Sequence, residues 1–175
     1  MKKIISIIVL MTAVAIFVGA ASLTDFTDNN EYVSKNEKSY KKDFDVKPGG
    51  KVNIELRCGG AIEIEGWDKN VVSVDLEESG KNADDINVEI EQDGNDINIS
   101  SYFDDEQHNN KTHQKLFVNV PREFNIDFET MGGEVRIDKV QGIMEGKTMG
   151  GQLDLSNLKG QLDIMTMGGE INVSD

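Results

Sequence analysis

The chain has 175 residues, of which 32 are Asp or Glu and 18 are Lys or Arg, so its formal net charge is −14 at pH 7. A chain this acidic does not suit the phosphate backbones of nucleic acids, which attract Lys and Arg, and nucleic acid is excluded as a partner. Anionic lipid surfaces should also repel it unless divalent cations bridge the two.

The first 21 residues indicate an export signal. Lys2 and Lys3 precede a largely apolar run, Ile4 to Ala21, which ends in small residues. This order is typical of a secretory signal peptide that is cleaved after Ala20 or Ala21. An uncleaved membrane anchor is the alternative, although the run is slightly shorter than the roughly 20 residues that a spanning helix needs. In both cases the remainder is predicted to be exported to the periplasm, the cell surface or the medium.

The chain after the signal divides into a linker and one domain. Residues 22–43 are polar and acidic with few apolar residues, which is typical of a disordered linker. Residues 44–175 form the predicted domain, and apolar and polar residues alternate in Val52–Leu56, Cys58–Ile64, Val71–Leu76, Ile86–Ile90, Ile97–Ile99 and Leu116–Val120. Asp93 and Gly94 lie between two of these segments and predict a hairpin turn. No helical period occurs, so the domain is predicted to be all-β.

Residues 124–175 repeat themselves every 18 residues. Thr130-Met131-Gly132-Gly133 recurs at Thr148 and at Thr166 without an insertion. A fixed period indicates a repeat architecture, and the short alternating segments predict one coil of a β-solenoid, or β-helix-like fold, per repeat. Because fewer than three coils are marginal alone, the N-terminal β region is predicted to pack on the first coil and cap it within a single domain.

Aligning the copies predicts which residues point inward, because side chains alternate between the two faces of a strand. The inward sets are Val135, Leu153 and Ile171; Ile137, Leu155 and Val173; and Ile126, Met144 and Leu162. Phe128 aligns with Gly146, which predicts that the large ring fills the space left by the glycine on the next coil.

Three motifs in order resemble a known family. Gly59–Lys69, Val118–Arg122 and the Gly-Gly repeats resemble the exported bacterial "putative adhesin" domains of unknown function. The resemblance covers Phe44 to Asp175 and implies an exported, all-β, solenoid-like domain, but it implies no catalytic residues. One departure stands out: the corner position before Gly-Gly, usually small or polar in such domains, is Met in all three copies.

Two columns of residues are candidate binding sites. Asp127, Glu145 and Asp163 form a predicted acidic row with about 5 Å between coils. Met131, Met149 and Met167 form the second column. They point outward as an apolar stripe if Thr130, Thr148 and Thr166 point inward, and the sequence leaves open whether the corner instead turns them into the core. Thioethers also suit Cu(I), although packing is the far commoner use of a methionine stripe.

Other residues give no site. His108 and His113 have no third ligand nearby in sequence, the turn at Asp93 lacks the glutamate of a calcium loop, and Cys58 is the single cysteine, so no internal disulfide can form. No cofactor or metal is therefore predicted, and burial is the default expectation for Cys58.

These observations predict a non-enzymatic, adhesin-like binding or scaffold module that acts through its outward faces. Its partner would be a protein or glycan of the envelope, or a second copy paired with the C-terminal coil edge. A carbohydrate-active β-helix enzyme is one alternative, because stacked carboxylates have the spacing of a retaining glycosidase pair. An envelope accessory protein that regulates a membrane partner is another.

Overall fold

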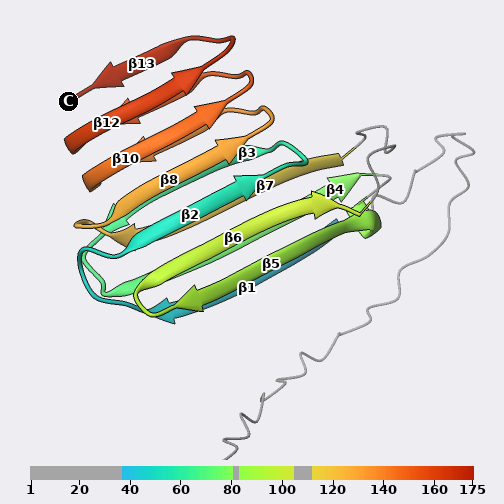
Figure 1. Ribbon diagram of the computed structural model, residues 1–175, viewed down its shortest axis with the longest axis horizontal. Helices are drawn as coiled ribbons and strands as arrows, with labels where there is room; N and C mark the ends of the chain where they lie inside the picture. The colour runs from blue at the N-terminus through green and yellow to red at the C-terminus, as the bar shows by residue number, and fades with distance from the viewer. Residues whose placement is uncertain (1–36, 81–82, 105–111) are drawn as a thin grey trace, which may run out of the picture. The chain divides into compact units, whose positions relative to one another are not determined.

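The computed structural model describes residues 37–80, 83–104 and 112–175 (Figure 1). The predicted signal peptide and residues 22–36 of the predicted linker lie outside this range, as does His108. The described residues form strands and one short 3-10 helix, η1 (Ala83–Asp85), so the all-β prediction is confirmed. No helix among them is long and apolar enough to cross a bilayer.

The strands form two sheets of mixed orientation. Sheet A has seven strands in the order β1 (Glu37–Asp45), β4 (Val71–Gly80), β7 (Thr112–Pro121), β3 (Ala61–Trp67), β9 (Val135–Asp138), β11 (Leu153–Ser156) and β13 (Ile171–Ser174). Sheet B has six strands in the order β12 (Lys159–Thr166), β10 (Gln141–Thr148), β8 (Asn125–Thr130), β2 (Lys51–Leu56), β6 (Asp96–Phe103) and β5 (Ile86–Asp93). The predicted hairpin at Gly94 is confirmed, since β5 and β6 pair antiparallel up to Asp93 and Asp96.

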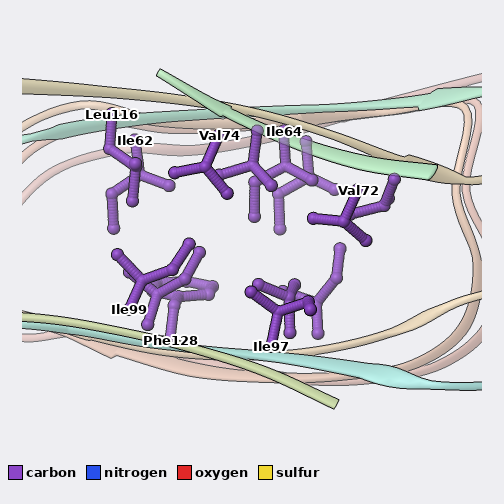
Figure 2. Packing of buried hydrophobic residues seen from close by; sticks show 14 of the residues in the cluster. Ile62, Ile64, Val72, Val74, Ile97, Ile99, Leu116 and Phe128 are labelled. Carbon is purple, nitrogen blue, oxygen red and sulfur yellow. The ribbon is translucent and has the colours of Figure 1, made fainter. Parts of the chain in front are cut away.

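One hydrophobic core lies between the two sheets. Figure 2 shows Ile62 and Val74 of sheet A pointing toward Ile97 and Phe128 of sheet B. Alternate residues of each strand enter this core because the side chains of a strand point to opposite faces in turn. The core cluster extends from Val46 through to Leu155, so the N-terminal strands and the repeats share it.

The three repeats stack in parallel. Each places one strand in sheet B and the next in sheet A, and we call such a pair of strands a rung: β8 with β9, β10 with β11, and β12 with β13. Leu153 faces both Val135 and Ile171 across the ladder, as the alignment predicted. A Cβ atom on Gly146 would overlap the ring of Phe128. This confirms the prediction that the ring fills the space left by the glycine on the next rung.

The N-terminal half supplies a further rung with the same register. Strands β2 and β3 pair in parallel with β8 and β9, so that Ile62 lies beside Val135 and Ile64 beside Ile137. The Gly60 N–H donates to the carbonyl oxygen of Gly132 at 2.7 Å, which joins the two Gly-Gly corners. Residues 68–124 intervene in sequence between these two rungs, yet the rungs are neighbours in space.

Strand β1 corrects the predicted linker boundary. It begins at Glu37, within the segment predicted to be a linker, and pairs antiparallel with β4. Only Tyr40 and Phe44 of this strand pack against the core. Its sequence therefore shows no regular apolar alternation, and pairing with β4 determines its conformation. The two sheets do not close into a single wound sheet, and the β-solenoid stays a prediction.

Candidate functional site

The repeated Thr-Met-Gly-Gly segments form the corners at which the chain passes from sheet B to sheet A. In the first corner the Thr130 hydroxyl donates to the carbonyl oxygen of Gly132 at 3.0 Å and accepts from its N–H at 3.3 Å. Thr148 and Thr166 make the same two hydrogen bonds with Gly150 and Gly168. Each threonine thus turns inward and satisfies the polar groups of the bend.

Backbone hydrogen bonds stack the corners on one another. The Met149 N–H donates to the Thr130 carbonyl at 3.1 Å, and the Met167 N–H donates to the Thr148 carbonyl at 3.0 Å. The ladder of the sheet therefore continues through the bend. Corners with these bonds hold their side chains in a fixed column.

The methionines of this column point outward. The exposed fractions of Met131, Met149 and Met167 are 57%, 52% and 71%, whereas Thr130 and Thr148 are buried. The outward alternative left open by the sequence is the one found, because the threonine side chains occupy the inner side of each bend. We call these three residues the methionine stripe. Nothing in the geometry assigns a ligand to it directly.

The corner between β2 and β3 differs from the repeated corners. Leu56 pairs with Thr130, and Ile62 pairs with Val135. Ile62 follows Leu56 by six positions, whereas Val135 follows Thr130 by five, so this corner contains one extra residue. Cys58 lies in this corner and is buried, with 7% of its surface exposed. Burial raises the pKa of its thiol to about 11, so the sulfur stays protonated at neutral pH. The stripe of exposed sulfurs therefore ends at Met131.

The predicted acidic row lies on the outer face of sheet B. Glu145 faces Asp127 on one side and Asp163 on the other across the parallel ladders. The Lys51 ammonium lies 3.3 Å from an Asp127 carboxylate oxygen, so this end of the row is partly neutralised. Among the described residues, no group of three or more His, Cys, Asp or Glu is arranged to hold a metal ion.

The row and the stripe share one face but do not meet. Along β8, Asp127 and Met131 are separated by the outward residue Glu129, and Lys147 stands between the row and the stripe on β10. Asp127, Glu129 and Lys147 line a hollow of about 280 Å³ over the acidic row, together with Glu145, Asp163 and Met165. The hollow brings several carboxylates together, and a pair of carboxyl groups is what a glycosidase uses. The hollow is open to solvent, since Glu145 and Asp163 are both exposed.

One buried polar group was missed by the sequence interpretation. Glu78 occupies an inward position of β4 and is 1% exposed. It accepts a hydrogen bond from Gln114 Nε2 at 2.5 Å, and Gln114 Oε1 accepts one from the Ser101 hydroxyl at 2.8 Å. The other oxygen of Glu78 has no partner among the described residues. The signal was present, since the inward alternation of Val72, Val74 and Leu76 continues to position 78.

Glu78 should make the stability of the domain depend on pH. Burial raises the pKa of Glu78 above its ordinary value of 4.5, against the opposing effects of Gln114 and Lys38. The folded state therefore favours the neutral carboxyl, so the contribution is fully present below the unfolded-state pKa and is lost as pH rises through the folded-state pKa. We expect Glu78→Gln to raise the free energy of unfolding at pH 7, because the neutral amide avoids the cost of desolvating a carboxylate.

Thermal melts of the wild type and Glu78→Gln at pH 4 and pH 7 measure this effect. The advantage of the variant should shrink at pH 4, where the wild-type carboxyl is protonated in both states. An advantage equal at the two pH values, or a loss of stability at pH 7, would contradict the buried-carboxyl account.

Comparisons with known proteins give only distant likenesses. No protein-family model matches the sequence, and no curated protein does. A "putative cell adhesion protein" from Clostridium sporogenes is 12% identical over 78% of this chain and 99% of its own, with a TM-score of 0.38. A "putative adhesin" from Bacteroides fragilis is 16% identical over 77% of this chain and 79% of its own, with a TM-score of 0.30.

A third solved structure carries a different name. A "putative lipid binding protein" from Parabacteroides distasonis is 14% identical over 77% of this chain and 59% of its own, with a TM-score of 0.29. At such distance, no function is carried from these proteins to this chain.

Proposed function

We propose that this chain is an exported, non-enzymatic binding or scaffold module of the cell envelope, with β-solenoid-like repeats and an adhesin-like mode of action through surface contacts. The observation that supports it is the methionine stripe, three large apolar side chains that stay exposed on hydrogen-bonded corners. Methionine side chains are flexible and polarizable, and surfaces built from them adapt to partners of different shape. Contiguous exposed apolar residues mark interaction sites in soluble proteins.

The last rung offers the second part of the contact surface. Strands β12 and β13 stand at one end of the two sheets, and β1 and β5 stand at the other (Figure 1). At the β12 and β13 end, Leu162, Ile171 and Val173 are 39%, 46% and 68% exposed, although they occupy inward positions. Their core-facing surfaces are uncovered in this structure.

The opposite end is closed. Lys42 reaches from β1 to the carbonyl oxygen of Ile90 on β5 at 2.8 Å, and Lys38 reaches the carbonyl oxygen of Ala83 at 3.2 Å. Charged side chains of this kind protect an edge from pairing with other chains. The contrast between the two ends favours the β12 and β13 end as the one that accepts a partner.

A second copy is the partner that fits this end. A two-fold axis perpendicular to the direction in which the rungs stack would place each terminal strand antiparallel to a terminal strand of the other copy. The inward residues of the two last rungs would then form one continuous core. Strand β13 carries no charged residue within Ile171–Ser174, so like-charge repulsion does not oppose its pairing. A protein or glycan of the envelope would meet the methionine stripe beside this end.

Replacing Met131, Met149 and Met167 together by Ser tests the stripe. Because all three are exposed, we expect the free energy of unfolding, obtained from a thermal melt, to stay within about 1 kcal/mol of the wild-type value. Binding to envelope extract in a pull-down should weaken, because the apolar contact is lost. The same triple replacement by Leu keeps an apolar stripe and should keep the binding. Unfolding of the Ser variant, or undiminished binding, would remove the stripe from the proposed function.

Val173→Lys tests the proposed pairing of the last rung. Its side chain is 68% exposed, so the melt should change little at low protein concentration. In sedimentation velocity the wild type should show a concentration-dependent dimer and the variant a monomer, since the charge would be buried in the interface. A monomeric wild type across the concentration range would refute self-association and leave the stripe as the proposed surface.

A carbohydrate-active enzyme is the second candidate, on the strength of the hollow over the acidic row. Asp127→Asn, Glu145→Gln and Asp163→Asn test this candidate by activity rather than by binding, because the acidic row is itself a candidate binding column. Release of reducing sugars from envelope polysaccharide by the wild type, abolished in these variants, would favour the enzyme instead. For the accessory protein that regulates a membrane partner, no feature of the described residues adds support.

A further inference from the structure

The methionine stripe presents three exposed thioether side chains at the corners. Each carbonyl oxygen of Gly132, Gly150 and Gly168 accepts two hydrogen bonds, one from a backbone N–H and one from a threonine hydroxyl. The threonine carbonyls of the first two corners accept the N–H groups of Met149 and Met167. These five carbonyl oxygens are therefore occupied by hydrogen bonds, while the thioethers of the stripe stay exposed.

We propose that the methionine stripe binds a soft monovalent metal ion, Cu(I), between the thioethers of successive corners. Thioether and thiolate sulfur are the protein ligands that select Cu(I), whereas Ca²⁺ and Mg²⁺ require oxygen. A column of thioethers, set where these bend carbonyls are already occupied, therefore favours such an ion over Ca²⁺ or Mg²⁺.

The spacing of the rungs fits this coordination. Corners that continue a β-ladder are about 4.8 Å apart, and so are the Cβ atoms of neighbouring methionines. With a first-row metal–sulfur bond of about 2.3 Å, two sulfurs on opposite sides of one ion are about 4.6 Å apart. Two stacked thioethers can thus bind one ion linearly with almost no movement of the backbone, and the third can approach because methionine has three rotatable bonds.

The charges around the stripe favour a cation. On the sheet B side, Glu129 precedes Met131 and Lys147 precedes Met149 by two residues each. On the sheet A side, the outward residues that follow the corners are Glu134, Gln152 and Glu170. Arg57 of the neighbouring corner is paired with Glu55 at 2.7 Å. Glu134 is paired with Arg136 at 2.6 Å, so the carboxylates of Glu129 and Glu170 stand against the ammonium group of Lys147, and the whole chain is strongly acidic.

Cysteine does not compete for the ion at this place. Cys58 is buried in its own corner, and its thiol stays protonated at neutral pH. The proposed site therefore consists of thioethers, whose affinity for metal does not depend on losing a proton. Binding should vary little between pH 5 and pH 8, unlike binding to thiolate or imidazole.

The test uses Ag(I), a redox-inert analogue of Cu(I), with the full exported chain labelled at the methionine methyl groups. In ¹H–¹³C NMR spectra, Ag(I) should shift the methyl signals of Met131, Met149 and Met167 at one equivalent. The buried Met144, which is 0% exposed, is the internal control and should not move. If the stripe signals stay in place while silver is bound elsewhere, the proposal fails.

Competition with a chromophoric Cu(I) chelator then measures affinity in the presence of a reductant. Replacing Met131, Met149 and Met167 by Leu should weaken Cu(I) binding by at least about tenfold, while Met144→Leu should leave it unchanged. An affinity unchanged by the triple Leu variant would overturn the site. The Leu variant keeps the apolar stripe, so a loss of metal with retained envelope binding separates this inference from the proposed function, on which it does not depend.

Discussion

Leu153→Asp should unfold the domain or destabilise it by more than about 4 kcal/mol, because it would bury an unpaired charge. Leu153 is 0% exposed and lies on the middle repeat rung between Val135 and Ile171. No basic side chain reaches this layer of the described core, which consists of apolar residues. Urea denaturation followed by circular dichroism measures the loss.

Gln152→Asp is the matched control, one residue away on the outer face. It introduces the same carboxylate on an exposed position. Its neighbours in the column, Glu134 and Glu170, are acidic, so a cost of up to about 1 kcal/mol is expected from like charges. Equal losses in the two variants would show that the inward and outward faces are wrongly assigned.

Gly151→Ala should destabilise the domain by about 3 kcal/mol, through the backbone rather than through the core. Gly151 has a φ of 112°, a conformation that residues with a Cβ atom rarely adopt. An added Cβ would also overlap the carbonyl oxygen of Gly133 in the neighbouring corner. Because the corners are stacked, neither can move away without breaking the hydrogen bonds between them.

Gly150→Ala, in the same corner, separates this effect from a general intolerance of the bend. The φ of Gly150 is not positive, and an added Cβ would meet only the Gly168 carbonyl oxygen, at an ordinary 3.7 Å. Thermal melts of both glycine variants measure the two effects, and for Gly150→Ala we expect the free energy of unfolding to change by less than about 1 kcal/mol. If Gly150→Ala were as damaging as Gly151→Ala, the two glycines would not have the distinct roles described.

The sequence alone determined the faces of the repeats and their register. The 18-residue period aligns Val135 with Leu153 and Ile171, and strand alternation then assigns each residue to one side. Both signals are local, since they depend on which residues recur and on the two-residue period of a strand. The exchange between Phe128 and Gly146 followed from the same alignment.

The candidate columns were predictable as columns, but not in their surroundings. That Asp127, Glu145 and Asp163 stack follows from the repeat. That Lys51 neutralises Asp127 does not, because Lys51 belongs to a strand far away in sequence that happens to be the next one in the sheet. The pairing of sequence-distant strands is a property of the whole fold.

Only the tertiary structure decided the side on which the methionines lie and the presence of β1, whereas the alternation of β4 already indicated the burial of Glu78. A Thr-Met-Gly-Gly segment can turn either way until the Thr130 hydroxyl finds its partners within the bend and the next corner stacks on it. Strand β1 has little apolar pattern and forms because β4 offers an open edge. If the Glu78 side chain pointed outward, the alternation of β4 would be broken and its apolar neighbours would leave the core. The packing of these neighbours therefore outweighs the cost of desolvating one carboxyl group.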